Sequence, residues 1–289
     1  METRPQFLIL PVVLSFLGTC IAWYYGHFHL GHAVLAFVGL LLAHISVNVL
    51  NDYHDFKSGV DLATKRTPFS GGSGILPGKL LEPGQVLRFG ITCFLLATAI
   101  GIYFVVVTSW QLLPLLVVGA LCILLYTPFI LKRNWPEWSP GLGLGALPVL
   151  GAFFVQANEY SWPAVIASIP SGILVHNLLF LNEFPDVEAD QTVNRKTLPI
   201  TIGREKASIV YAALMIILYL WIIGWVIADK MPVYTLIALL TLPFTLKAIL
   251  GARKYGDMKK LMPAMASNVL VVLLTQLLLG IGYILAKVI

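Results

Sequence analysis

The chain of 289 residues is 58% hydrophobic and only 11% charged, with a formal net charge of +5. A soluble domain usually carries about a quarter charged residues, so this composition excludes an ordinary soluble protein and predicts an integral membrane protein. The three cysteines, Cys20, Cys93 and Cys122, lie inside apolar runs. Their position argues against a disulfide framework or a cysteine-bound metal.

Apolar runs mark the candidate membrane spans, because a helix needs about 20 mostly apolar residues to cross a bilayer. Nine such runs cover residues 7–25, 32–50, 86–108, 111–130, 140–157, 161–181, 206–228, 232–250 and 264–288. The first run has no convincing small-residue cleavage site, so it predicts a retained helix rather than a signal peptide. We therefore expect an all-α, multi-pass membrane bundle of about nine transmembrane helices around a central cavity, in a single domain over 1–289.

The positive charges predict the orientation of the bundle, because cytoplasmic loops are enriched in Lys and Arg. With the N-terminus inside, all of the 19 Lys and Arg residues except Lys230 and Lys287 fall on the inside. The long loops 51–85, 182–205 and 251–263 lie on that same side. We therefore predict a cytoplasmic N-terminus and cytoplasmic active-site loops, in the cell membrane if the source is prokaryotic.

Two acidic motifs, "NVLNDYHD" and "NEFPDVEAD", end the second and the sixth predicted spans. Each repeats Asn or Asp about once per helical turn and so places its polar side chains on one helix face. The members are Asn48, Asn51, Asp52 and Asp55 in the first motif and Asn182, Asp186 and Asp190 in the second. An even number of helices separates the motifs, so both lie on the same side. This suggests parallel halves over about 1–133 and 134–250 with a ninth helix at 264–288.

Two converging faces of carboxylates would repel each other unless a cation lay between them. Oxygen ligands of this kind suit Mg²⁺, which bridges protein carboxylates to substrate phosphates. The simpler interpretation, that these acids cap helices or pair with loop lysines, fits a single Asp better than two clusters of matched spacing. Ionisable groups at membrane depth are expensive and usually functional, so the pattern favours a metal site.

Basic residues and glycines follow the motifs in the same loops. Arg66, Arg195 and Lys196 lie within about a dozen residues of the acids, where they could donate charge-assisted hydrogen bonds to a diphosphate. They fit equally well as orientation signals that face anionic lipid. The glycine-rich stretch "RTPFSGGSGILPGKLLEP" at 66–83 could wrap phosphate oxygens, hinge a lid or simply connect two spans.

These motifs resemble the two signatures of the UbiA superfamily of intramembrane aromatic prenyltransferases. "NDYHDFKSGVD" is similar to an NDxxDxxxD-type first signature; Gly59 stands at the strict third acid and Asp61 follows it, as in the 1,4-dihydroxy-2-naphthoate branch. "NEFPDVEAD" resembles the DxxxD-type second signature, and "NRKTLPITIG" resembles the stretch that follows it. "YTPFILKR" resembles the Tyr-Pro-Lys stretch that closes the fourth helix. The resemblance extends over residues 7–288.

The resemblance implies a Mg²⁺-dependent transfer of a polyprenyl group from polyprenyl diphosphate to an aromatic acceptor at the lipid bilayer, with no nucleic-acid partner. The expected acceptor is 1,4-dihydroxy-2-naphthoate in menaquinone biosynthesis, with 4-hydroxybenzoate or homogentisate as alternatives. The implied metal ligands are Asn48, Asn51, Asp52, Asp55, Asp186 and Asp190, of which the four aspartates also act in catalysis. The implied substrate contacts are Asn48, Asp61, Arg66, Tyr126, Lys132, Asn182, Arg195 and Lys196.

Two other functions use acids in membrane helices. A transporter would use them as a cation or proton path, but it would place them near the midplane rather than at one end of the spans. A membrane phosphotransferase of the CDP-alcohol type also uses Asp-rich helix ends with Mg²⁺. Its continuous DGxxAR signature is absent from the chain.

Overall fold

The computed structural model describes residues 8–64 and 66–289, and every regular element within them is a helix. The long elements are α1 (Ile9–Tyr24), α2 (Leu30–Ser58), α4 (Pro83–Val107), α5 (Leu113–Leu125), α7 (Leu147–Ala157), α8 (Trp162–Asn182), α11 (Arg204–Ile227), α12 (Leu242–Ala252) and α13 (Met258–Val288). Short helices α3 (Val60–Ala63), α6 (Trp138–Gly141), α9 (Val187–Thr192) and α10 (Leu198–Thr201) connect them. The 3-10 segments are η2 (Trp110–Leu112), η3 (Ile130–Lys132) and η5 (Val233–Thr241), and η4 (Leu142–Ala146) is a π-helix.

The helices coincide with the predicted apolar runs. In the described part of the chain, 7 helical segments are long and apolar enough to cross a membrane, and the shorter apolar segments Ile9–Tyr24 and Trp110–Leu125 match the first and fourth runs. The all-α membrane class is therefore confirmed, whereas nine spans and the division into two halves stay predictions. The second run was expected to end at residue 50, but α2 continues to Ser58 and carries the first acidic motif on its last turns.

Local sequence fixes several helix ends. Pro83 opens α4 behind a capping box formed by Glu82 and Gln85. At the start of α8, the Ser161 hydroxyl accepts a hydrogen bond from the Ala164 N–H at 3.3 Å. Gly59 ends α2 with φ of 82°, in the left-handed region that favours glycine. Because α3 begins at the next residue, Asp61 stays close to the acidic end of α2.

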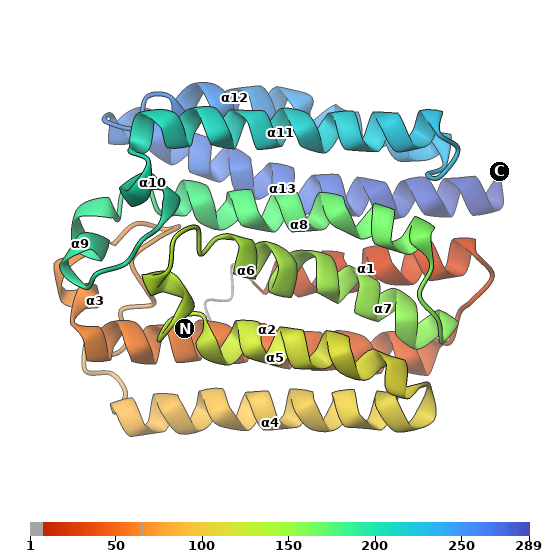
Figure 1. Cartoon of the computed structure of the whole chain (residues 1–289), viewed down its shortest axis with the longest axis horizontal. Coiled ribbons are helices and arrows are strands. Elements are labelled where there is room, and N and C mark those ends of the chain that lie inside the picture. Colours follow the sequence, from red (N-terminus) through yellow and green to blue (C-terminus); the bar gives the residue numbers. More distant parts are fainter. Residues whose placement is uncertain (1–7, 65) are drawn as a thin grey trace.

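The long helices lie nearly parallel, with α4 at one side of the bundle and α11 and α12 at the other (Figure 1). Helix α1 packs against α7 and α13, and α8 packs against α11, α13 and the α6–η4 segment. The short helices α3, α9 and α10 gather at one end of the bundle (Figure 1). Both acidic motifs consequently emerge at that end.

Polar side chains inside the bundle bond across helices. The Tyr211 hydroxyl donates to Asn268 Oδ1 at 3.0 Å, and the Asn268 amide donates to the Asn177 carbonyl at 3.0 Å. The Asn177 amide completes the network by donating to the Tyr211 carbonyl at 3.3 Å. Buried polar groups are tolerated when they are hydrogen-bonded, so this network ties α8, α11 and α13 together without exposing a polar group to lipid.

Glycines let the α6–η4 segment approach α8 closely. A Cβ at Gly145 would lie 2.5 Å from the Ser171 carbonyl oxygen, and a Cβ at Gly141 would lie 2.9 Å from that of Gly172. Small residues at such a crossing allow two backbones to touch. The π-helix η4 lies at this contact, and π segments inside helices are frequent near functional sites.

We expect Gly145→Val to destabilise the folded protein by about 1–3 kcal/mol, because an overpacked contact forces the backbones apart. The measurement is the midpoint of thermal unfolding in detergent. Gly224→Val is the matched control, since Gly224 is an exposed helical glycine with no heavy atom of the described chain within 4 Å of a Cβ. Equal shifts in the two variants would contradict the close approach.

Candidate active site at the end of the bundle

A cavity of about 160 Å³ lies where the two acidic motifs meet. Its walls come from the ends of α2 and α8, from α3 and α9, from the α6–η4 segment and from the glycine-rich loop. The predicted site residues that line it are Asn48, Asn51, Asp55, Asp61, Tyr126, Asn182, Asp186, Asp190 and Arg195. Residues from separate parts of the sequence therefore share one pocket, as the spacing of the motifs predicted.

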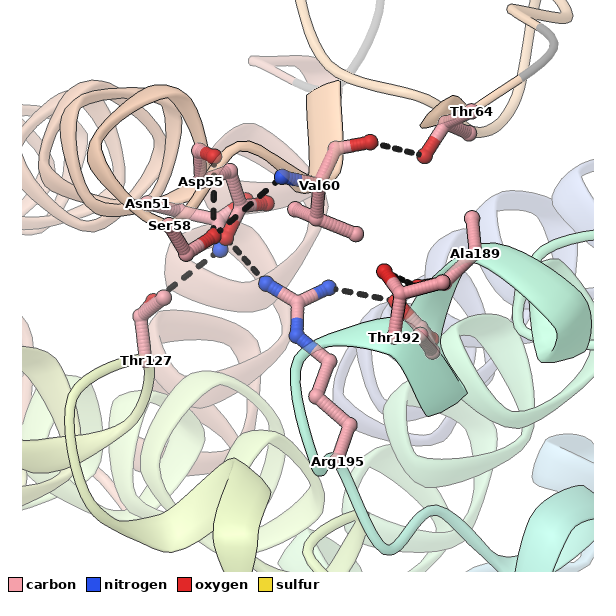
Figure 2. A network of polar contacts seen from close by, with 10 residues as sticks. Asn51, Asp55, Ser58, Val60, Thr64, Thr127, Ala189, Thr192 and Arg195 are labelled. Atoms are coloured by element: carbon pink, nitrogen blue, oxygen red, sulfur yellow. Dashed lines mark hydrogen bonds and ion pairs between the residues drawn. The ribbon is translucent and has the colours of Figure 1, made fainter. Parts of the chain in front are cut away.

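Arg195 joins the two motifs directly. Its Nη1 donates to Asp190 Oδ1 at 2.8 Å, and its Nη2 donates to Asp55 Oδ1. Figure 2 shows the guanidinium between the end of α2 and helix α9. All three side chains are largely buried. The sequence predicted that Arg195 would contact a diphosphate; in the structure its partners are the carboxylates themselves.

The glycine-rich loop closes over the first motif. Asp52 is only 1% exposed, and its Oδ2 accepts a hydrogen bond from the Ser73 N–H at 3.1 Å. Gly72, with φ of 72°, lies so close to Asp61 that a Cβ there would be 2.9 Å from Oδ1. On the other side, the Asn51 amide donates to the Thr127 hydroxyl at 3.0 Å. The backbone of the loop thus contacts carboxylates. That it also wraps phosphate oxygens stays a prediction.

Asp186 retains an unsatisfied oxygen. Its Oδ1 is buried, and no hydrogen-bond donor of the described residues reaches it. Burial raises the pKa of Asp186 to about 7, and the neighbouring carboxylate of Asp190 adds to the rise. A buried carboxylate oxygen without a donor is costly unless a cation or another partner binds it. This oxygen points to a ligand that the protein itself does not supply.

The donor set fits Mg²⁺ by its chemistry, since the cavity offers carboxylate and amide oxygens and the unsatisfied Asp186 Oδ1. Over residues 8–64 and 66–289, however, no three His, Cys, Asp or Glu side chains form a cluster that could hold a metal ion. The Arg195 guanidinium lies between Asp55 and Asp190 instead. The individual ligand assignments therefore stay predictions.

Four of the predicted residues do not line the cavity. Asp52 lies behind it under the glycine-rich loop, while Arg66, Lys132 and Lys196 are exposed. The Arg66 guanidinium donates to the Ser73 carbonyl and so fastens the loop to itself. Lys196 contributes through its backbone, because its N–H donates to the Leu131 carbonyl at 2.9 Å.

Sequence reasoning missed a pair of buried glutamates, Glu137 and Glu183. Glu183 lines the cavity, and its carboxyl group interacts with that of Glu137. Burial raises the pKa of both, and for Glu183 the adjacent Glu137 raises it further. Glu137 Oε1 also accepts a hydrogen bond from the Leu198 N–H at 2.6 Å, which anchors the segment that carries Arg195. The "NEFPD" run hints at Glu183, but no local pattern singles out Glu137.

We expect Arg195→Met to destabilise the metal-free protein by about 3–5 kcal/mol, because the buried carboxylates of Asp55 and Asp190 lose their shared cation. Added Mg²⁺ should recover part of this loss. Thermal unfolding with and without Mg²⁺ measures both effects. Arg204→Met is the control: Arg204 pairs with Glu188, whose side chain is 71% exposed, and such a pair is worth at most about 1 kcal/mol. Similar shifts for both variants would refute a special role for Arg195.

Comparisons with known proteins identify the family of the chain. The model of the UbiA prenyltransferase family matches residues 10–284. A 1,4-dihydroxy-2-naphthoate octaprenyltransferase of Bacillus subtilis (strain 168) is 30% identical over 252 residues, which are 86% of this chain and 80% of the relative. The enzyme of the same name in Escherichia coli (strain K12) is 24% identical over 98% of this chain and 94% of its own length.

Solved structures share the fold. The apo structure of a UbiA homologue from Aeropyrum pernix K1 superposes with a TM-score of 0.71 at 15% identity, over 99% of this chain and 98% of that one. A homologue from Archaeoglobus fulgidus, bound to DMAPP and Mg²⁺, gives a TM-score of 0.63 at 14% identity, over 93% and 99%. Because the family model covers nearly the whole chain, the chain belongs to the UbiA prenyltransferase family and is a prenyltransferase.

Proposed function

We propose that this enzyme transfers a polyprenyl group from a polyprenyl diphosphate to 1,4-dihydroxy-2-naphthoate, a Mg²⁺-dependent step of menaquinone biosynthesis. The convergence of both acidic motifs and Arg195 on one cavity carries the proposal. The relatives named as 1,4-dihydroxy-2-naphthoate octaprenyltransferases support the acceptor. The homologue bound to DMAPP and Mg²⁺ supports an allylic diphosphate as donor and Mg²⁺ as cofactor.

The acidic end of the bundle would hold the diphosphate headgroup. The residues that would hold Mg²⁺ are Asn48, Asn51, Asp52, Asp55, Asp186 and Asp190. Bound Mg²⁺ neutralises a diphosphate and makes it a better leaving group. Arg195 donates charge-assisted hydrogen bonds to the remaining phosphate oxygens, for which its planar guanidinium is suited. In the structure, the same guanidinium compensates Asp55 and Asp190.

The inner wall of the cavity keeps water from the reacting carbon. Val175 and Leu178 of α8 and Leu144 of η4 are among the residues that line it. When the C–O bond of the donor breaks, the allylic carbon becomes electron-poor and would react with any water nearby. Apolar walls exclude that water and leave an electron-rich aromatic ring as the nucleophile. We assign Tyr126, which lines the same cavity, to the contact with this acceptor.

The cavity faces the cytoplasm in this proposal. By the topology predicted from the sequence, all Lys and Arg residues except Lys230 and Lys287 fall on the same side as the acidic motifs, and the cytoplasmic side carries this excess. Both the water-soluble headgroup and the acceptor would then reach the site from the cytoplasm, while the prenyl tail remains in the apolar part of the bundle.

A mixed-acceptor assay tests the acceptor. Purified protein with Mg²⁺, a polyprenyl diphosphate and equal amounts of 1,4-dihydroxy-2-naphthoate, 4-hydroxybenzoate and homogentisate should yield the prenylated naphthoate as the main product by mass spectrometry. A main product from one of the other two rings would overturn the acceptor but not the reaction. Accumulation of a solute in sealed vesicles without any prenyl product would instead support a transporter.

Replacing a motif carboxylate by an amide should abolish transfer. We expect Asp52→Asn and Asp186→Asn each to lower kcat/KM about 100-fold or more, because several kcal/mol of metal-dependent stabilisation are lost. Diphosphate release measures the rate. Asp229→Asn is the control, since Asp229 is an exposed carboxylate in the turn after α11. Activity near that of the control in either motif variant would remove the two-motif assignment.

A further inference from the structure

His44 is a buried side chain of the polar cavity to which no role has yet been assigned. It lies on α2 one helical turn before Asn48, is only 3% exposed and lines the cavity. Its Nδ1 lies 3.0 Å from the carbonyl oxygen of Leu40 on the same helix. Because a carbonyl oxygen only accepts, Nδ1 carries the proton and donates. In the neutral ring, Nε2 is therefore a bare nitrogen that can only accept a hydrogen bond.

This Nε2 atom lacks a donor. It is buried, and no group of residues 8–64 and 66–289 donates a hydrogen bond to it. A buried acceptor without a donor costs free energy, so such an atom needs a partner from outside the protein. Nε2 is the ring nitrogen farther from the backbone, and the side chain lines the polar cavity. A donor for Nε2 would therefore come from a molecule in that cavity.

A second buried histidine, His176 on α8, shows the contrast. Its Nε2 accepts a hydrogen bond from Trp135 Nε1 at 3.0 Å, and its Nδ1 lies 3.1 Å from Asn177 Oδ1. Both ring nitrogens thus have partners within the protein. His176 does not line the polar cavity. The unsatisfied nitrogen of His44 is consequently a property of the cavity and not of every histidine that the bundle buries.

His44 lies deeper in the bundle than the carboxylates of the first motif. Helix α2 runs toward the acidic end and finishes there at Ser58. At 1.5 Å per residue, His44 is about 6 Å from Asn48 and about 12 Å from Asp52 along the helix axis. Leu144, which lines the polar cavity with His44, also lines a second, apolar cavity. A ligand group bound to His44 would therefore lie further inside than a headgroup held by the acids.

The chemistry of the substrates limits which group can donate to Nε2. An ionised diphosphate and a ring carboxylate offer only acceptors, and an isoprenoid tail carries no polar hydrogen. Mg²⁺ prefers oxygen ligands, which makes an imidazole nitrogen a poor partner for it. The phenolic hydroxyls of the aromatic acceptor are the donors that remain.

We propose that His44 binds the aromatic acceptor by accepting, at Nε2, a hydrogen bond from one of its phenolic hydroxyls. The assignment rests on the proposed function, because that function supplies the phenol. The hydrogen bond orients the ring and makes its oxygen more electron-rich, which favours attack by the ring on the allylic carbon. The proton stays on the phenolic oxygen, so this contact requires no base. Because a ring without that hydroxyl leaves Nε2 unpaired, His44 selects for phenols.

The test removes each partner of the hydrogen bond in turn. The Kd values of 1,4-dihydroxy-2-naphthoate, 1-hydroxy-2-naphthoate and 4-hydroxy-2-naphthoate are measured with Mg²⁺ and geranyl thiolodiphosphate, so that no reaction occurs. The wild type should bind the dihydroxy compound about ten-fold or more tightly than one of the two monohydroxy compounds. His44→Leu should abolish this preference, because the loss of one partner makes the other irrelevant. His44→Gln, whose amide oxygen can accept, should keep part of it.

His176→Leu is the matched control, since it removes a buried histidine that does not line the cavity, and it should keep the wild-type preference. Thermal unfolding verifies that each variant is folded. A measurement on the wild type alone does not depend on the variants. Among the six histidines, one bare ring nitrogen should shift its ¹⁵N resonance when the dihydroxy compound binds. It should not shift with the monohydroxy compound that binds weakly.

The outcomes separate this inference from the proposed function. Prenyl transfer by the wild type, combined with an unchanged preference in His44→Leu or with no ¹⁵N shift, would overturn the role of His44 alone. The partner of Nε2 would then be a buried water. A wild type that neither binds any of the three naphthoates nor transfers a prenyl group to them would overturn both proposals.

Discussion

The compensation of buried carboxylates by a cation is the interaction on which this site depends. Removing one ion from water costs several kcal/mol, and the acidic motifs place their carboxylates at the end of an apolar bundle. Arg195 offsets part of that cost by bridging Asp55 and Asp190. Asp186 Oδ1 still lacks a donor from the described residues. The donors of the described residues therefore compensate the carboxylates only in part, which is the condition under which a divalent cation would bind.

Two loops bring the charges together, and each is anchored by backbone hydrogen bonds. The segment with Arg195 is held by the N–H groups of Lys196 and Leu198, which donate to the Leu131 carbonyl and to Glu137. The glycine-rich loop is held over the first motif by the Ser73 N–H on Asp52. Glu137 does not line the polar cavity and consequently supports the Arg195 segment. Preorganised groups of this kind lower the cost of binding a charged headgroup.

Two adjoining cavities of different polarity lie in the bundle: the polar cavity of the acidic motifs, and an apolar chamber lined by α2, α4, α5 and α7. The polar cavity gathers carboxylates and a guanidinium at the end of the bundle, while the chamber along α2 offers apolar walls. The junction at Leu144 lies within the π-helix η4, which glycine contacts hold against α8.

The sequence predicted the features that depend on local pattern. Apolar run length placed the helices, and the spacing of Asn and Asp placed both motifs at the same end, because an even number of helices separates them. The sequence could not predict that Arg195 bridges Asp55 and Asp190. The contact between Arg195 and Asp55 joins two segments that are distant in the chain, and no local pattern indicates it. The sequence did not predict the role of Glu137 or the apolar chamber for the same reason. Both arise from packing between helices, which no single run of residues encodes. Hydropathy ended the second span at residue 50, because it marks the apolar part of a helix and not its polar end; only the spacing of Asn48, Asp52 and Asp55 indicated that the helix continues, as α2 does to Ser58.

The most direct measurement is a structure with Mn²⁺ and a polyprenyl thiolodiphosphate, with anomalous scattering to locate the metal. The account predicts anomalous peaks in the gap between the two motifs, within bonding distance of Asp52 or Asp55 on one side and of Asp186 or Asp190 on the other. The diphosphate should lie on the same peaks. A bound analogue with no metal in that gap, and with Arg195 still on both carboxylates, would contradict it.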